Sequence, residues 1–249
     1  MKLAPKVTPY VIEPVDNTPL ESWKIPDGDL VFYKQSPDAV YIDGKKFEDF
    51  DSGIYTYVLP EEFETMTKVY ADVEDYMVQE VDGSMLSLYH KNAPEVKYVY
   101  TLLNRRPRYQ GNISSLQRYA VKNYSCSSEQ VSGTNNNVAG NAFDGDFATR
   151  WSAGGVGEWL TMDLGEVKDI EAIGVAVFKG AERYQMLRIM TSNDGENWSE
   201  LFGGVTVIEN GDDMNYYSAG CRARYVRLVG YQCSANKWNS ITEFAAYGK

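Results

Sequence analysis

Alternation of apolar and polar residues in the second half of the chain constrains the fold most. Leu160, Met162 and Leu164 share one face of an extended segment. The same period of two recurs at Ile173, Val175 and Val177, at Leu187 and Ile189, and at Val226 and Leu228. Successive side chains of a β-strand point to opposite faces, so each segment has one apolar face to bury. The pattern predicts a β-sandwich whose inner faces form the core.

A second constraint is the run at residues 141–151, in which Asp144 and Asp146 flank Gly145. Glycine accepts a positive φ, so this tripeptide favours a tight turn. Such a turn can gather both carboxylates and the Thr149 hydroxyl around one hard cation, as calcium requires. The spacing does not match an EF-hand loop, because no glutamate closes a twelve-residue frame. A metal-free, solvated turn is the alternative interpretation.

Further motifs follow the Asp-Gly-Asp run in a fixed order. They are an alternating segment at 158–165, an Asp-Gly turn before a tryptophan at 194–198, a strand at 224–228 and a closing segment at 241–248. In this order and spacing the series resembles the discoidin domain, also called the coagulation factor type C domain, and is similar to family 32 carbohydrate-binding modules. The resemblance covers about residues 122–249. It implies a galactose-binding-like β-sandwich of jelly-roll type with sugar-binding loops at one end.

The resemblance also implies a structural calcium ion. The family places its cation in the loop before the first tryptophan and completes the shell with a carboxylate from the last strand. Here these positions are Asp144, Asp146, Thr149 and Glu243. The tryptophans that the family uses for packing are Trp151, Trp159 and Trp198, and we expect all of them in the core.

Sugar binding needs an aromatic platform and a few polar side chains that fix the ligand. Trp238 lies in a polar loop and is the best candidate for an exposed aromatic. Galactose-binding relatives often carry a histidine where this chain has Ser152, so galactose preference is not implied, and loss of sugar binding stays open. The ligand-binding positions implied by the family's loops are Glu129, Ser152, Phe178, Lys179, Arg183, Asn236 and Trp238.

Residues 1–110 resemble no family and read as a smaller β-rich docking or assembly domain with at most one helix. Its first thirty residues hold five prolines, which predicts an extended arm with an edge strand at 10–12. Asp-Gly pairs predict hairpin turns at Asp43-Gly44 and Asp82-Gly83. Other strands are expected at 30–33, 53–59 and 96–102.

Two segments of the first half leave a choice or mark a boundary. After Pro60, apolar residues at helical spacing predict a helix over 63–77, although residues 69–73 also alternate like a strand. We expect residues 111–121 to be a linker that precedes the discoidin-like domain at 122–249, with a short connecting helix within 113–124.

Composition excludes several classes of function. The 249 residues carry a net charge of −11, which disfavours nucleic acid and anionic lipid as partners. No apolar run is long enough for a membrane-spanning helix, and we see no signal peptide. With His90 as its one histidine, and with neither a phosphate-binding glycine loop nor a zinc-binding spacing, the chain is not expected to be an enzyme.

These observations predict a non-catalytic carbohydrate-binding or adhesion protein. We expect it at a virion surface or outside the cell, as a decoration, fibre or baseplate component of a phage. Residues 1–110 would contact protein partners or further copies of the chain. One alternative is the binding-module fragment of a secreted polysaccharide-degrading enzyme. Another is a purely structural protein in which the discoidin fold mediates protein contacts.

Overall fold

The computed structural model describes residues 36–63, 66–104, 108–206, 208 and 211–249. The strands expected at 10–12 and 30–33, and the proline-rich arm, lie outside these residues. Two compact units are present. Within the described residues, the first unit comprises 36–55, 67–81 and 85–100, and the second comprises 56–63, 66, 82–84 and the described residues from 101 to 249.

The described residues form β-strands and short 3-10 turns but no α-helix, which confirms the mainly β class. A small sheet has the order β2-β1-β4, with β1 at Ala39–Ile42, β2 at Lys45–Lys46 and β4 at Val69–Asp72. Asp43 and Gly44 adopt φ values of 50° and 84°, as a two-residue hairpin requires, so the first predicted hairpin is confirmed.

A second sheet has the order β3-β7-β6-β5. Its strands are β3 (Thr56–Val58), β5 (Met77–Asp82), β6 (Met85–His90) and β7 (Lys97–Leu103). The turn between β5 and β6 and the strand expected at 96–102 are confirmed. The helix expected over 63–77 was wrong: a 3-10 turn spans Glu61–Phe63, and β4 takes the alternating segment.

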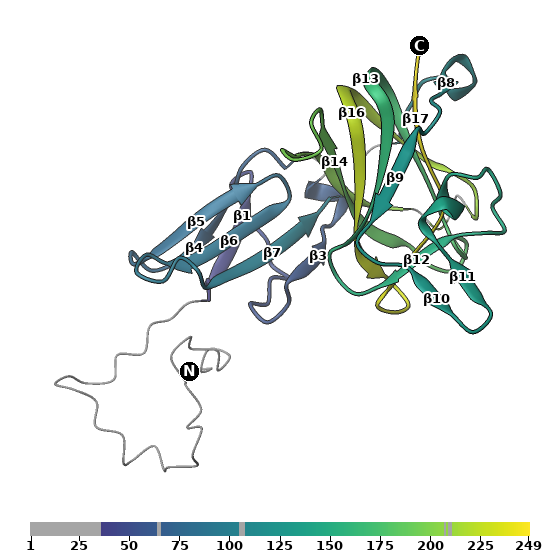
Figure 1. Ribbon diagram of the computed structural model, residues 1–249. Helices are drawn as coiled ribbons and strands as arrows, with labels where there is room; N and C mark the ends of the chain where they lie inside the picture. Colours follow the sequence, from purple (N-terminus) through teal and green to yellow (C-terminus); the bar gives the residue numbers. More distant parts are fainter. Residues whose placement is uncertain (1–35, 64–65, 105–107, 207, 209–210) are drawn as a thin grey trace. The chain divides into compact units, whose positions relative to one another are not determined.

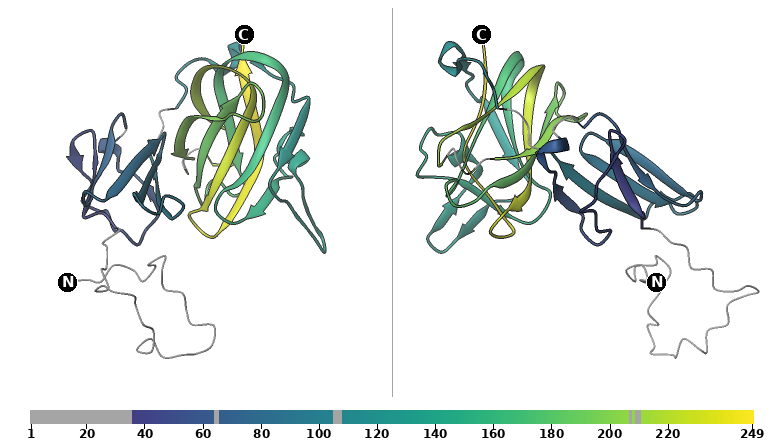
Figure 2. Two further views of the ribbon diagram at one scale, coloured as in Figure 1. Left: turned by 60° about the vertical axis from the view of Figure 1, so that its left-hand side comes forward. Right: turned by 180° about the vertical axis from the view of Figure 1, so that it is seen from behind.

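The larger β-structure of the second unit has the order β12-β17-β13-β16-β14-β15, with β8 paired to β17 and β9 to β13. The two long strands β13 and β16 pair with two register shifts, one between Asp163 and Lys168 and one between Ile170 and Ala172. Such irregularities let the strands bend while they stay paired. Figures 1 and 2 show the pair side by side across the domain. The strands are β8 (Gln117–Arg118), β9 (Asn123–Cys126), β12 (Trp151–Gly154), β13 (Glu158–Val177), β14 (Gln185–Ser192), β15 (Ser199–Val205), β16 (Asn215–Cys233) and β17 (Trp238–Gly248).

Short elements complete this unit. A two-stranded sheet consists of β10 (Gln130–Ser132) and β11 (Asn135–Asn137). Two 3-10 turns, η3 and η4, span Ile113–Ser115 and Ala139–Ala142.

The segment expected to be a linker is part of the sandwich. Within it, β8 pairs with the end of β17, where Arg118 lies opposite Tyr247. The next residue, Tyr119, is buried in the core, and its N–H donates to the Ala246 carbonyl. The short connecting helix expected within 113–124 was wrong: this segment consists of the η3 turn, β8, an irregular stretch at 119–122 and the start of β9.

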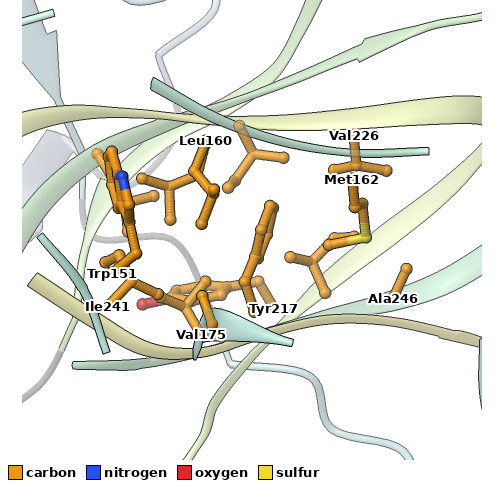
Figure 3. Close-up of a cluster of buried hydrophobic side chains, with 14 of the residues drawn as sticks. Trp151, Leu160, Met162, Val175, Tyr217, Val226, Ile241 and Ala246 are labelled. Atoms are coloured by element: carbon orange, nitrogen blue, oxygen red, sulfur yellow. The ribbon is translucent and has the colours of Figure 1, made fainter. Parts of the chain in front are cut away.

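Figure 3 shows the hydrophobic core of the second unit, which includes Trp151, Leu160, Met162 and Val175. Every residue named for the period-two pattern is at most 3% exposed, so the predicted inner faces are confirmed. The prediction that all three packing tryptophans lie in the core was wrong for Trp159 and Trp198, because both are only half-buried. They lie against the Arg227 guanidinium, whose carbon is 4.1 Å from the Trp159 ring centroid and 3.8 Å from that of Trp198.

None of the described residues belongs to a helix that is long and apolar enough to cross a bilayer.

Candidate functional site

One end of the sandwich presents an aromatic side chain to solvent. Antiparallel pairing of β12 with β17 sets Ser152 opposite Ser240 and Gly154 opposite Trp238. The Trp238 side chain is 39% exposed. Three atoms of its ring lie 3.6 Å from the point where a Cβ atom would stand if residue 154 were not glycine. The indole therefore covers a glycine and stays open to solvent, at the opposite end of β17 from the C-terminus marked in Figure 1.

Phe178 comes directly after β13 and lies at the same end of the sandwich as Trp238. Its N–H donates to the Ser240 carbonyl at 3.1 Å. Two guanidinium groups lie over its ring: the guanidinium carbon is 3.9 Å from the ring centroid for Arg150 and 5.1 Å for Arg183. These are cation–π distances. The guanidinium groups of Arg150 and Arg183 are thus both placed on Phe178, whose backbone is bonded to β17, the strand that carries Trp238.

Internal hydrogen bonds hold each arginine by one nitrogen. Arg150 Nε donates to Ser152 Oγ at 3.2 Å, and Arg183 Nε donates to the Phe178 carbonyl at 2.8 Å. Neither guanidinium forms an ion pair with a carboxylate of the described residues. Burial lowers the pKa of Arg150, and the nearby positive charge of Arg183 lowers it further.

Ser152 does not lie where a ligand can reach it. It is 1% exposed, and its hydroxyl lies 3.0 Å from that of Ser240. We expected Ser152 to contact the ligand, but it instead accepts the hydrogen bond that orients Arg150.

The remaining predicted ligand residues are exposed, but their polar atoms have protein partners. Lys179 Nζ pairs with Glu182 at 3.1 Å. The Asn236 amide oxygen accepts from the Trp238 N–H at 3.0 Å and so shapes the turn before β17. Glu129 accepts from the Ala139 N–H at 3.0 Å. Of the predicted set, the structure therefore brings Arg183 onto the Phe178 ring and bonds Phe178 to Ser240, two residues from Trp238 on β17.

A buried amide network supports this end from inside. Asn239 is fully buried, and its amide nitrogen donates to the carbonyls of Ala153 and Gly155. Its amide oxygen accepts from the N–H of Gln232, a residue held at a φ of 82°. A Cβ on Gly230 would come within 2.2 Å of that oxygen, so glycine is needed there for the close approach. The sequence hypothesis missed both Arg150 and Asn239.

The loop expected to bind a cation gathers oxygen atoms around Thr149. Its hydroxyl lies 2.8 Å from Asp144 Oδ2, 3.1 Å from the Asp146 carbonyl oxygen and 3.3 Å from the Asn141 carbonyl oxygen. Gly145 adopts a φ of 83°, as the tripeptide predicts. Asp146 turns its own carboxylate to the Ala148 N–H at 2.9 Å. Oxygen donors of this kind fit calcium.

Glu243 reaches the same loop from β17. It is fully buried, and one carboxylate oxygen accepts from the Gly145 N–H at 2.6 Å while the other accepts from the Arg118 guanidinium. Burial raises the pKa of Glu243, whereas Arg118 acts in the opposite direction. Within the described residues, no group of three or more acidic, histidine or cysteine side chains lies close enough to hold a metal. Any cation here would therefore depend on carbonyl and hydroxyl oxygens as well as on carboxylates.

Comparison with known proteins identifies this part of the chain. Residues 123–244 match the F5/8 type C domain family, so the chain contains a discoidin domain. This confirms the predicted resemblance.

Solved structures refine the class. The family 32 carbohydrate-binding module of AlyQ, solved in complex with 4,5-unsaturated mannuronic acid, is 30% identical with a TM-score of 0.50, covering 53% of this chain and 99% of that one. A truncated AlyQ with this module and alginate lyase domains gives the same identity and TM-score, covering 53% of this chain and 33% of that one. The discoidin domain thus has the carbohydrate-binding module fold.

Among curated proteins, a polysaccharide lyase 8 family protein of Enterococcus faecalis, HylA, is 31% identical over 119 residues. The match covers 45% of this chain and 8% of HylA, so the chain spans a small part of that relative's length.

Proposed function

We propose that the discoidin domain is a non-catalytic carbohydrate-binding module. It takes a glycan at the end of the sandwich formed by Trp238, Phe178 and Arg183. The observation that carries the proposal is the exposed Trp238 indole, which lies on Gly154 beside the Phe178 cluster. A sugar ring packs its apolar face on such an indole, while nearby donors bind its hydroxyl groups.

The AlyQ module supports this proposal. At 30% identity and with nearly its whole length matched, it was solved with a sugar bound. The fold is therefore compatible with sugar binding at this level of similarity.

A glycan array tests the proposal, probed with the full chain and with Trp238→Ala. We expect a set of bound glycans for the parent chain and a loss of at least tenfold in affinity for Trp238→Ala, as truncation of a central aromatic anchor predicts. Trp198→Ala is the matched control, because it removes an equally large, half-buried ring that contacts Arg227 instead. Folded protein that binds no glycan would overturn the proposal and favour a protein-contact role.

The context of the module has two candidates. The match to HylA favours a binding module that belongs to a polysaccharide-degrading protein. The alternative, an adhesion component at a virion surface or elsewhere outside the cell, with residues 1–110 docking on protein partners or on further copies of the chain, stays a prediction from the sequence.

Two assays separate these contexts. Incubation of the full chain with uronate polysaccharides would reveal lyase activity by the ultraviolet absorbance of unsaturated ends, and we expect none. Light scattering would detect self-association, which the adhesion candidate predicts and the enzyme-module candidate does not require.

We also propose a structural calcium ion in the loop around Thr149. Asp144, Asp146, Thr149 and Glu243 would hold it together with backbone carbonyl oxygens. Its effect would be to fix the loop against β17 and so raise the stability of the domain.

A further inference from the structure

We propose that the site selects a sugar that carries a carboxylate, and that Arg150 and Arg183 bind this group. The inference rests on the proposed glycan site and names its ligand class. It assigns a binding role to Arg150, which no sequence motif indicated.

The first argument is a comparison with other arginines of the described residues. Arg224 pairs with Asp163, and Arg222 with Asp169. Arg118 and Arg188 likewise pair with Glu243 and Glu200. The chain has 35 acidic residues against 24 basic ones, so carboxylates are abundant. Among the described arginines without a carboxylate partner, Arg150 and Arg183 are the two that share one ring, whereas Arg227 lies alone on Trp159 and Trp198.

The second argument is electrostatic. Two like charges beside the same ring repel each other, and partial burial of Arg150 increases the cost of its charge. The Phe178 ring face offsets part of this cost through cation–π attraction. An anion between the guanidinium groups would remove the repulsion and replace it with two attractive interactions.

The third argument is the set of donors that remains. Each Nε atom is engaged within the protein, on Ser152 Oγ or on the Phe178 carbonyl. The terminal Nη donors of both forks have no hydrogen-bond partner within the described part of the chain. A fork of this kind matches the two oxygens of a carboxylate, and such bonds are about twice as strong as neutral ones.

The fourth argument is position. Trp238 and Ser240 are two residues apart on β17, so their side chains share a face at a spacing of about 7 Å along the strand. Phe178 is anchored at Ser240. A sugar stacked on Trp238 would therefore direct its substituents toward the arginine pair, with the ring on the indole and the carboxylate on the guanidinium groups.

Calorimetry with matched ligands tests the inference. The probes are trimers of mannuronate and of galacturonate, each compared with the same trimer after reduction of its carboxyl groups to alcohols. We expect the full chain to bind at least one uronate trimer about tenfold or more tightly than its reduced form. Arg150→Gln and Arg183→Gln should each abolish this preference.

Arg222→Gln is the control, because it removes the same charge from an exposed ion pair elsewhere on the domain and should leave the preference unchanged. Circular dichroism and the thermal midpoint would establish that each variant is folded. Arg150→Lys provides a second check, since it keeps the charge without the fork and should restore less than half of the lost preference.

The failures can be told apart. Equal binding of uronate and reduced trimers, abolished in both cases by Trp238→Ala, would overturn the carboxylate inference and leave the glycan site in place. Binding of sulfated trimers alone would also overturn it. Absence of binding to every oligosaccharide by folded protein would overturn the inference together with the proposed function.

Discussion

The Glu243 carboxylate accepts a hydrogen bond from the Gly145 N–H at 2.6 Å, across 98 residues of sequence. This contact joins the last strand of the discoidin domain to the Asp-Gly-Asp loop. Because Glu243 is fully buried, its charge depends on partners, and Arg118 is the partner that the structure provides. The loop and the chain end are therefore stabilised together, with or without a metal.

Calcium should raise the thermal midpoint of the domain. A ligand that binds only the folded state at about 100 times its dissociation constant adds about 2.7 kcal/mol. Asp144→Asn should remove most of this increase, because Asp144 Oδ2 belongs to the oxygen cluster around Thr149. Differential scanning calorimetry with millimolar calcium, and then with a chelator, makes the measurement.

Magnesium serves as the control, since it demands a smaller, more rigid octahedral shell and should have a weaker effect. An unchanged midpoint in millimolar calcium would contradict the metal site and favour the metal-free turn.

The ion pair of Asp163 with Arg224 should make stability depend on pH. Arg224 donates from Nε at 2.8 Å and from a terminal nitrogen at 2.9 Å, and its side-chain hydrogen bonding is the main cause that lowers the pKa of Asp163. For an acid with a lowered folded-state pKa, the stabilisation is present above the unfolded pKa of about 4 and is lost as the pH falls through the folded value.

Asp163→Asn should therefore cost about 1.5–3 kcal/mol at pH 7, the usual range for hydrogen bonds to charged groups. The difference from the parent chain should shrink steadily below pH 4. Urea titrations at several pH values test this, and a difference that stays constant down to pH 2 would refute the assignment.

Arg227 should stabilise the domain mainly by stacking. Its guanidinium lies between Trp159 and Trp198, and its Nε donates to Thr161 Oγ1 at 2.8 Å. Two partly buried cation–π contacts predict a loss of about 1–2 kcal/mol for Arg227→Ala. Arg227→Lys keeps the charge but not the planar contact, so we expect it to recover less than half of that loss. Full recovery in urea unfolding would mean that charge, and not stacking, is the important property.

Among these positions, substitution of Glu200 should lower the free energy of unfolding most. Its carboxylate is 2.5 Å from Arg188 Nε, and both side chains are only 7% exposed. It also accepts from the Ser84 N–H at 3.0 Å, and Gly83 permits this approach because a Cβ there would come within 2.4 Å of the carboxylate.

Removal of one partner from a buried ion pair costs about 3–5 kcal/mol, so Glu200→Ala should lower the free energy of unfolding by that amount. Glu182→Ala, at the exposed pair with Lys179, is the control and should cost less than about 1 kcal/mol. Equal losses in denaturant unfolding would show that burial does not distinguish the two pairs.

Local pattern was enough where the deciding interactions are local. The alternation at Leu160, Met162 and Leu164 gave the buried face, because a strand has a period of two in any sheet. The Asp43-Gly44 turn followed from the conformations that these two residues tolerate. The helical spacing over 63–77 misled, because the same residues also alternate and strand pairing with β1 prevailed at Val69–Asp72.

By itself, the sequence determined the β-sandwich class, the discoidin domain that begins near residue 122 and the exposure of the Trp238 aromatic side chain. Only the tertiary structure decided which charges meet. Arg118 meets Glu243 across 125 residues, and Arg150 lies on the Phe178 ring, because β8, β12 and β13 all pair with β17. It also placed Trp159 and Trp198 on either side of Arg227 and not in the core. Such contacts depend on register and on strand order, which one-dimensional spacing does not encode.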